Sequence, residues 1–163
     1  MIEITGTHHY GLTVTSIDIS SRFYQDTLGF EKVFSWNPKA DYISKLVGYE
    51  TVDLHGEILK LPCSNFFLEL LEYKNIKNQH LEMSNGNIGS AHLALKVKGL
   101  EDVYTNLLAS GVKFVSPPVT PTIGPNKGGK AVYMIDPDGF RIELIESAKS
   151  FSDFSMEKGR DDG

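Results

Sequence analysis

The hydrophobic positions of the chain follow the same order of patterns twice. In residues 8–33, and again in residues 91–115, alternating apolar and polar side chains give way to apolar positions three or four residues apart. Alternation predicts a half-buried strand, and the wider spacing predicts an amphipathic helix. Gly29 and Gly111 follow the two helical patterns, as glycine commonly does at the end of a helix. Each half of the chain is therefore expected to begin with a strand and a helix.

Three further strand patterns follow in each half. They lie around residues 30–35, 57–61 and 66–72 in the first half, and around 112–115, 130–135 and 140–146 in the second. The order β-α-β-β-β thus occurs twice, which predicts an α+β fold with a mixed, curved sheet.

The repeat also predicts the domain organisation. We expect a single domain over residues 1–146, with a first module over about 5–75 and a second over about 88–146. Residues 147–163 are polar and show no hydrophobic pattern, so they are predicted to form a flexible tail.

Four of the predicted strands carry one histidine or glutamate on the face opposite their leucines, isoleucines and valines. These residues are His9, Glu69, His92 and Glu143. In each half the histidine comes from the first strand and the glutamate from the last. A carboxylate in mid-strand is costly unless it is solvated, paired or bound to a metal. Imidazole with carboxylate suits zinc, nickel, cobalt, manganese or iron, so we expect one divalent ion per site. The alternative is two packed histidines and two glutamates in salt bridges.

Four stretches carry a resemblance to a known family: HHYGLTV with FYQDTLGF, FLELLEY, AHLALKV and DPDGFRIELIE. Together they span most of residues 5–146, and they resemble the vicinal oxygen chelate superfamily. That superfamily includes glyoxalase I, methylmalonyl-CoA epimerase, fosfomycin resistance proteins, bleomycin resistance proteins and extradiol dioxygenases. The resemblance implies paired βαβββ modules in a cup-shaped sheet with helices on its outer face. It also places the first ligand at His9 rather than His8, because the ligand in this motif lies two residues before Gly-Leu.

The same resemblance implies a class of reaction. Metal ligands at Glu69 as well as at Glu143 are typical of glyoxalase I and of related lyases and epimerases. We therefore expect a metal-dependent lyase, isomerase or epimerase that acts on a small oxygenated substrate. Glu143 and Glu69 are the candidate catalytic residues, and Glu143 is slightly favoured as the base.

Three other activities of related proteins stay open. An iron-dependent extradiol dioxygenase normally uses two histidines and one carboxylate. A transferase of the fosfomycin resistance type likewise lacks the fourth ligand. A metal-free small-molecule binding protein would need none of the four.

Two long connections, residues 36–56 and 116–129, are candidate binding loops. The side chains that they and their borders offer to a substrate are Trp36, Tyr49, Lys127 and Lys130. The alternatives are packing of the aromatic rings on the sheet and plain solvent exposure of the lysines.

Composition narrows the choice of partners. The formal net charge is −5 and basic clusters are lacking, which argues against nucleic acid. No apolar run approaches the roughly 20 residues of a membrane span. A single cysteine and an N-terminus without a signal-peptide pattern favour the cytoplasm. The family resemblance implies a homodimer whose ligands come from one chain or from two.

Overall fold

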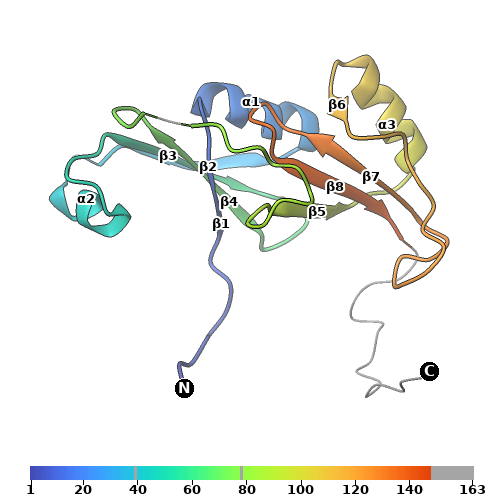
Figure 1. The fold of residues 1–163 in the computed structure, drawn as a ribbon, viewed down its shortest axis with the longest axis horizontal. Coiled ribbons are helices and arrows are strands. Elements are labelled where there is room, and N and C mark those ends of the chain that lie inside the picture. The colour runs from blue at the N-terminus through green and yellow to red at the C-terminus, as the bar shows by residue number, and fades with distance from the viewer. Residues whose placement is uncertain (39, 78, 148–163) are drawn as a thin grey trace. The chain divides into compact units, whose positions relative to one another are not determined.

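The computed structural model describes residues 1–38, 40–77 and 79–147 of the chain. The chain divides into two compact units, Met1–Leu81 and a second unit that begins at Glu82. Each unit consists of one four-stranded sheet with helical segments (Figure 1). The predicted flexible tail, apart from Ser147, lies outside the described residues.

The first unit contains four strands and two helices. In chain order they are β1 (Tyr10–Thr13), α1 (Ile17–Leu28), β2 (Glu31–Trp36), α2 (Asp41–Val47), β3 (Leu54–Lys60) and β4 (Phe67–Tyr73). The strand order in the sheet is β1-β4-β3-β2. β1 runs parallel to β4, whereas the other neighbouring strands are antiparallel.

The second unit repeats this topology without the extra helix. Its elements are β5 (His92–Lys96), α3 (Leu100–Ala109), β6 (Lys113–Phe114), β7 (Lys130–Ile135) and β8 (Arg141–Glu146). The strand order in the sheet is β5-β8-β7-β6. β5 runs parallel to β8, and the other neighbouring strands are antiparallel. The predicted α+β fold of two tandem βαβββ modules is confirmed.

The core of each unit lies on the helix-facing side of its sheet. Leu68 and Leu70 of β4 are fully buried, as is Tyr24 of α1. Ile142 and Leu144 of β8 are buried in the same way. The residues between them along β4 and β8 are only partly buried, as alternation along a strand requires.

Glu72 and Glu146, at the ends of β4 and β8, bind the starts of helices. Both glutamates follow the candidate ligand of their strand by three residues. Glu72 Oε2 accepts a hydrogen bond from the Ile17 amide of α1 (3.1 Å). Glu146 accepts hydrogen bonds from the amides of Gly99 and Leu100 at the start of α3 (2.8 and 3.1 Å). Each carboxylate satisfies backbone donors that a helix start leaves unpaired.

These contacts change the acidity of both carboxyl groups. Burial raises the pKa of Glu72, but hydrogen bonds from Lys74 and the Ile17 amide outweigh it, so the net pKa lies below the ordinary value of 4.5. The Gly99 and Leu100 amides lower the pKa of Glu146. Both helix starts are therefore stabilised by the ionised form of the glutamate.

Residues 36–56, predicted as a long connection, contain the helix α2. Ile43 is buried, and the Ser44 hydroxyl accepts a hydrogen bond from the Val52 amide (3.1 Å). Gly48 ends the helix with φ 77°, a conformation that glycine adopts without strain. A helix of this length gives too short a periodic pattern to stand out in the sequence. In the part of the chain that the structure describes, no helix is long and apolar enough to span a bilayer.

Replacing Glu72 by alanine should lower the free energy of unfolding by about 1 kcal/mol at pH 7, the usual cost of a lost helix cap. The folded-state pKa of Glu72 is lowered, so its contribution is present above the ordinary value of 4.5 and is lost as the pH falls through the folded-state value. The difference between the two proteins should therefore shrink below about pH 4. Denaturant unfolding of both proteins between pH 3 and 8 measures it.

The matched control is Glu50→Ala, which removes an exposed carboxylate. It should change stability by no more than about 0.5 kcal/mol at any of these pH values. A loss for Glu72→Ala that did not depend on pH would contradict a role for the ionised carboxylate.

Candidate functional site

His9 and Glu69 form the first His–Glu pair. Glu69 lies in mid-strand on β4, and in the parallel register of β1 and β4 its partner is Gly11. The Nε2 atom of His9 lies 3.1 Å from Oε2 of Glu69. The side chains are 34% and 17% exposed, so the pair is partly open to solvent.

His8 adds a second imidazole to this pair. Its Nδ1 atom lies 2.6 Å from Nδ1 of His9, and the rings meet edge to face. One of the two Nδ1 atoms must carry the proton of this contact. Nδ1 of His9 is therefore hydrogen-bonded to His8, and Nε2 of His9 faces Glu69. A hydrogen bond at the second ring nitrogen orients the ligand histidine in many metal sites.

His92 and Glu143 form an equivalent pair in the second unit. β5 runs parallel to β8, and Glu143 has Ala94 as its register partner, just as Glu69 has Gly11. His92 Nε2 lies 3.3 Å from Glu143 Oε2, with the side chains 46% and 17% exposed. Each unit thus brings together the histidine and the glutamate that the sequence assigned to it.

The geometry of both pairs fits a bound divalent ion. In a tetrahedral site with bonds of about 2.05 Å, two ligand atoms lie about 3.3 Å apart. The His–Glu distances of 3.1 and 3.3 Å agree with this spacing. The same distances also suit an ion pair without a metal. Among residues 1–38, 40–77 and 79–147, no cluster of three or more potential metal ligands occurs, and each pair supplies two donors.

Tyr133 lies next to the second His–Glu pair, a position that the sequence analysis did not predict. It lies opposite Glu143 in the register of β7 and β8, and its ring meets His92 edge to face with centroids 5.3 Å apart. Burial raises the pKa of the Tyr133 phenol, and the negative charge of Glu143 and a hydrogen bond to it act in the same direction. The corresponding residue opposite Glu69 is Ile58. The Asp-Pro-Asp-Gly turn connects β7 to β8 and so determines which of their residues lie opposite each other. This turn is the feature of the sequence from which the position of Tyr133 could have been predicted.

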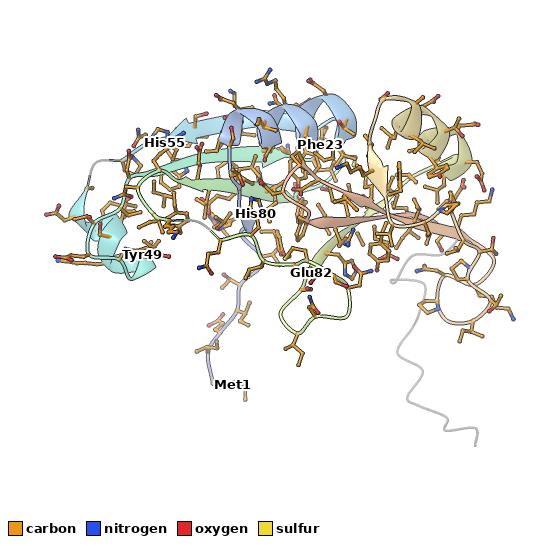
Figure 2. All side chains as sticks on the ribbon, turned by 45° about the horizontal axis from the view of Figure 1, so that its top comes forward. Met1, Phe23, Tyr49, His55, His80 and Glu82 are labelled. Carbon is orange, nitrogen blue, oxygen red and sulfur yellow. The ribbon has the colours of Figure 1, made fainter. Side chains whose placement is uncertain are left out.

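Trp36 and Tyr49, the predicted aromatic substrate contacts, lie in the first unit. The Trp36 indole covers Gly56, its register partner on β3, so closely that a Cβ atom there would overlap the ring. Tyr49 packs edge to face on Tyr73 with ring centroids 5.9 Å apart and remains 44% exposed (Figure 2). Packing thus accounts for Trp36, whereas the Tyr49 ring stays accessible.

The predicted lysines do not lie together with Glu143. Lys127 is exposed in the turn before β7. Lys130 pairs with Glu146 in the register, which places it on the opposite face of the sheet from Glu143, and its Nζ atom lies 3.1 Å from Oε1 of Glu101. A contact between Lys130 and a substrate at Glu143 finds no support in this arrangement.

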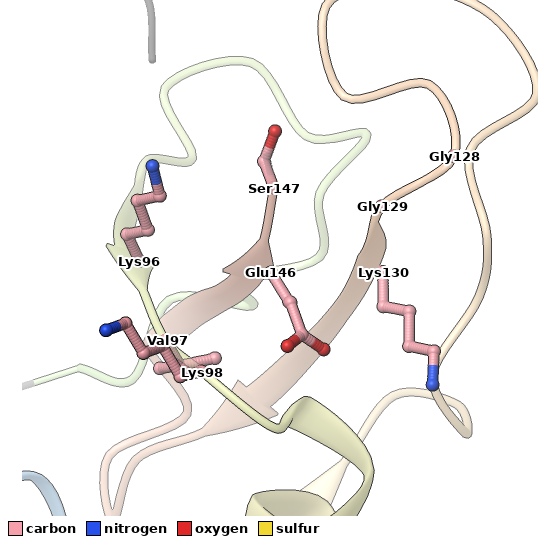
Figure 3. A pocket seen from close by; sticks show the side chains of 8 residues that line it. All are labelled: Lys96, Val97, Lys98, Gly128, Gly129, Lys130, Glu146 and Ser147. Carbon is pink, nitrogen blue, oxygen red and sulfur yellow. The ribbon is translucent and has the colours of Figure 1, made fainter. Parts of the chain in front are cut away.

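Lys130 instead borders a hollow at the end of the second sheet. The hollow has a volume of about 640 Å³ and is lined by Lys96, Val97, Lys98, Gly128, Gly129, Lys130, Glu146 and Ser147. Figure 3 shows the Lys96 and Lys130 side chains extending away from each other, with the Glu146 carboxylate between their strands. Because these two lysines point away from each other, the hollow does not bring their positive charges to one point. Its carboxylate, Glu146, is already bound by the amides at the start of α3.

The remaining histidines have separate partners. His55 is the second residue of β3, although residues 36–56 were predicted as a loop. Its Nε2 atom lies 3.4 Å from Oδ1 of Asp53 and 2.8 Å from Nδ2 of Asn37. His80 lies 3.4 Å from the Thr15 hydroxyl. Both are labelled in Figure 2.

Comparison with known proteins identifies the family. Residues 6–144 match the model of the Glyoxalase/Bleomycin resistance protein/Dioxygenase superfamily. The chain belongs to this superfamily. It is 32% identical over 147 residues to a lactoylglutathione lyase of Haemophilus influenzae, covering 88% of this chain and 94% of that protein. It is also 30% identical over 143 residues to a 2-epi-5-epi-valiolone epimerase of an Actinomyces species, covering 85% of this chain and 77% of the other.

Solved structures share the fold of this superfamily member. A glyoxalase family protein from Bacillus cereus matches with a TM-score of 0.76 at 15% identity, over 90% of this chain and 96% of that one. The trypanothione-dependent glyoxalase I of Leishmania major matches with a TM-score of 0.61 at 20% identity, over 85% of this chain and 84% of that one. Members of the superfamily typically use a divalent metal.

Replacing Gly56 by alanine should displace the Trp36 indole, because the new methyl group would overlap the ring. Overpacking of this kind costs about 1–3 kcal/mol of stability. Trp36 is the single tryptophan of the chain, so its fluorescence emission reports the displacement directly.

Gly6→Ala serves as the control, since a Cβ atom at Gly6 meets no atom within 4 Å. Its emission spectrum and stability should match those of the wild type. Unchanged emission in Gly56→Ala would contradict the packing of Trp36 on β3.

Proposed function

We propose that this protein is a divalent-metal-dependent lyase, isomerase or epimerase of glyoxalase type. The observation that carries the proposal is the repeated His–Glu pair. Both units place a histidine from their first strand next to a glutamate from their last, at 3.1 and 3.3 Å. Relatives named as a lyase and as an epimerase, at 32% and 30% identity, support this class of reaction.

Under this proposal, His9, Glu69, His92 and Glu143 are the four ligands of one ion. Each histidine would bind through Nε2, the atom that faces the glutamate of its own pair. The bound ion would supply positive charge that stabilises negative charge on a substrate oxygen. A set of two histidines and two carboxylates differs from the two-histidine, one-carboxylate set of extradiol dioxygenases.

The two glutamates would also move protons. A carboxylate beside a substrate carbon can take a proton next to a carbonyl and return it to another carbon or another face. The partial exposure of both carboxylates leaves them reachable for a substrate. We assign the base to Glu143, and Tyr133 would hold its carboxylate in place through the phenol. Glu69 faces Ile58 instead and lacks such a donor at that position.

We propose further that the protein acts as a homodimer, the commonest closed assembly of soluble proteins. The ligand pairs of one ion could then come from one chain or from two. Mixing His9→Ala and His92→Ala proteins would distinguish the two cases. Sites built from two chains regain activity in the mixture, because some sites then contain neither substitution.

Glu143→Gln should retain metal and lose proton transfer. Glutamine preserves the size of the side chain and one oxygen ligand but does not accept the proton, so exchange should fall by about 10²–10⁴-fold. The assay follows exchange of the carbon-bound proton in D₂O by NMR, with the glutathione hemithioacetal of methylglyoxal and with 2-oxo acids. Plasma mass spectrometry on the same samples measures the metal.

Glu31→Gln is the matched control, because Glu31 is an exposed glutamate of β2. It should leave exchange unchanged. Full exchange in metal-loaded Glu143→Gln would remove Glu143 as the base. Dioxygen uptake with catechols by the wild type would instead support the dioxygenase alternative.

A further inference from the structure

Arg141 lies on the same face of β8 as Glu143. The two are separated by one residue, Ile142, whose side chain is buried on the opposite face. In the register, Arg141 has His92 as its partner on β5 and Ile135 as its partner on β7. The Arg141 side chain thus starts from the main chain directly beside the second His–Glu pair.

One nitrogen of the guanidinium group is hydrogen-bonded and another has no partner. Its Nε atom donates a hydrogen bond to the main-chain carbonyl of Met83 (3.1 Å). Nη1 of Arg141 is buried and is the one such side-chain atom without a hydrogen-bond partner in the described part of the chain. A buried donor on a charged group is expensive to leave unpaired, more so than a neutral one. A planar guanidinium is suited to the paired oxygens of a carboxylate or phosphate. Such a group can reach Nη1 only when the atoms that cover this nitrogen move aside.

The first unit has no such group at the equivalent place. Phe67 precedes Glu69 by two residues, as Arg141 precedes Glu143. The neighbours of Glu69 across the strands are also apolar or small, Ile58 and Gly11. Arg141 and Tyr133 thus distinguish the second pair from the first and give it donors that a polar part of a substrate could use.

We propose that Arg141 binds an oxyanion of the substrate, a carboxylate or a phosphate, a few bonds from the reacting oxygens. The Arg141 side chain starts about 4.8 Å from His92, on the neighbouring strand, and about 6.7 Å from Glu143 along β8. The inference rests on the proposed function, because it takes the His–Glu pairs as the place where the reacting oxygens bind. It narrows the substrate class from small oxygenated compounds to small anionic ones.

Three hydroxamates with the same chelating group test this assignment. Acetohydroxamate carries no further charge, malonomonohydroxamate adds a carboxylate, and phosphonoacetohydroxamate adds a phosphonate. Calorimetric titration of zinc-loaded wild type should show one of the charged compounds binding at least about tenfold more tightly than acetohydroxamate. Whichever charged compound binds more tightly identifies carboxylate or phosphate as the natural group.

Arg141→Gln should abolish this preference while acetohydroxamate affinity and zinc content stay unchanged. Arg141→Lys, which keeps the charge but loses the paired donors, should retain part of it. Lys113→Gln is the control, because Lys113 is an exposed cation whose register partner, Ile135, is also a partner of Arg141. It should retain the full preference. A wild type without preference, or an Arg141→Gln protein that kept it, would overturn the proposal.

A second titration separates this inference from the metal site. If no protein binds acetohydroxamate, the proposed metal site has failed, and the Arg141 site is then tested in metal-free protein with inorganic phosphate. The Nε–H signal of Arg141 in the NMR spectrum, assigned by its absence from Arg141→Gln, should shift on addition of phosphate. A signal that does not move would overturn the oxyanion site independently of any metal.

Discussion

The parallel pairing of the first and last strand of each unit is the constraint on which the candidate site depends. β1 beside β4, and β5 beside β8, bring residues far apart in the sequence into direct register. One face of each pair then carries a histidine and a glutamate, and the other carries the buried leucines and isoleucines of the core. A shift of either register by one residue would move the carboxylate to the core face, where ionisation is far more costly. The packing of the core therefore fixes the position of the polar pairs.

The last strand of each unit carries a glutamate on each face of its sheet. Glu72 and Glu146 follow Glu69 and Glu143 by three residues, so alternation directs them to the helix side. There they bind the amides at the starts of α1 and α3. The strand that carries the candidate ligand in its middle thus anchors a helix at its end, which holds both elements in one arrangement. On the other face the two repeats differ beside the glutamates, where Tyr133 and Arg141 take the places of Ile58 and Phe67.

Much of this could be predicted from the sequence because it depends on local periodicity. Alternation and helical spacing, seen twice, predicted the order of the strands and helices along the chain and the four candidate ligands without any knowledge of distance. The helix α2 escaped because a single buried side chain, Ile43, anchors an element of seven residues. The roles of Glu72, Glu146 and Tyr133 depend on pairing between strands, and the unpaired nitrogen of Arg141 depends on where the Met83 carbonyl lies. None of these leaves a periodic signal.

The central claim is that the two His–Glu pairs act as one metal site. Plasma mass spectrometry on protein purified without chelator, in parallel with His9→Ala, His92→Ala and the control His55→Ala, tests it most directly. The account predicts about one ion per chain in the wild type and in His55→Ala, and loss of the ion when either paired histidine is removed. Two ions per chain, with each substitution removing only one, would contradict it, as would a wild-type protein that takes up no metal on reconstitution.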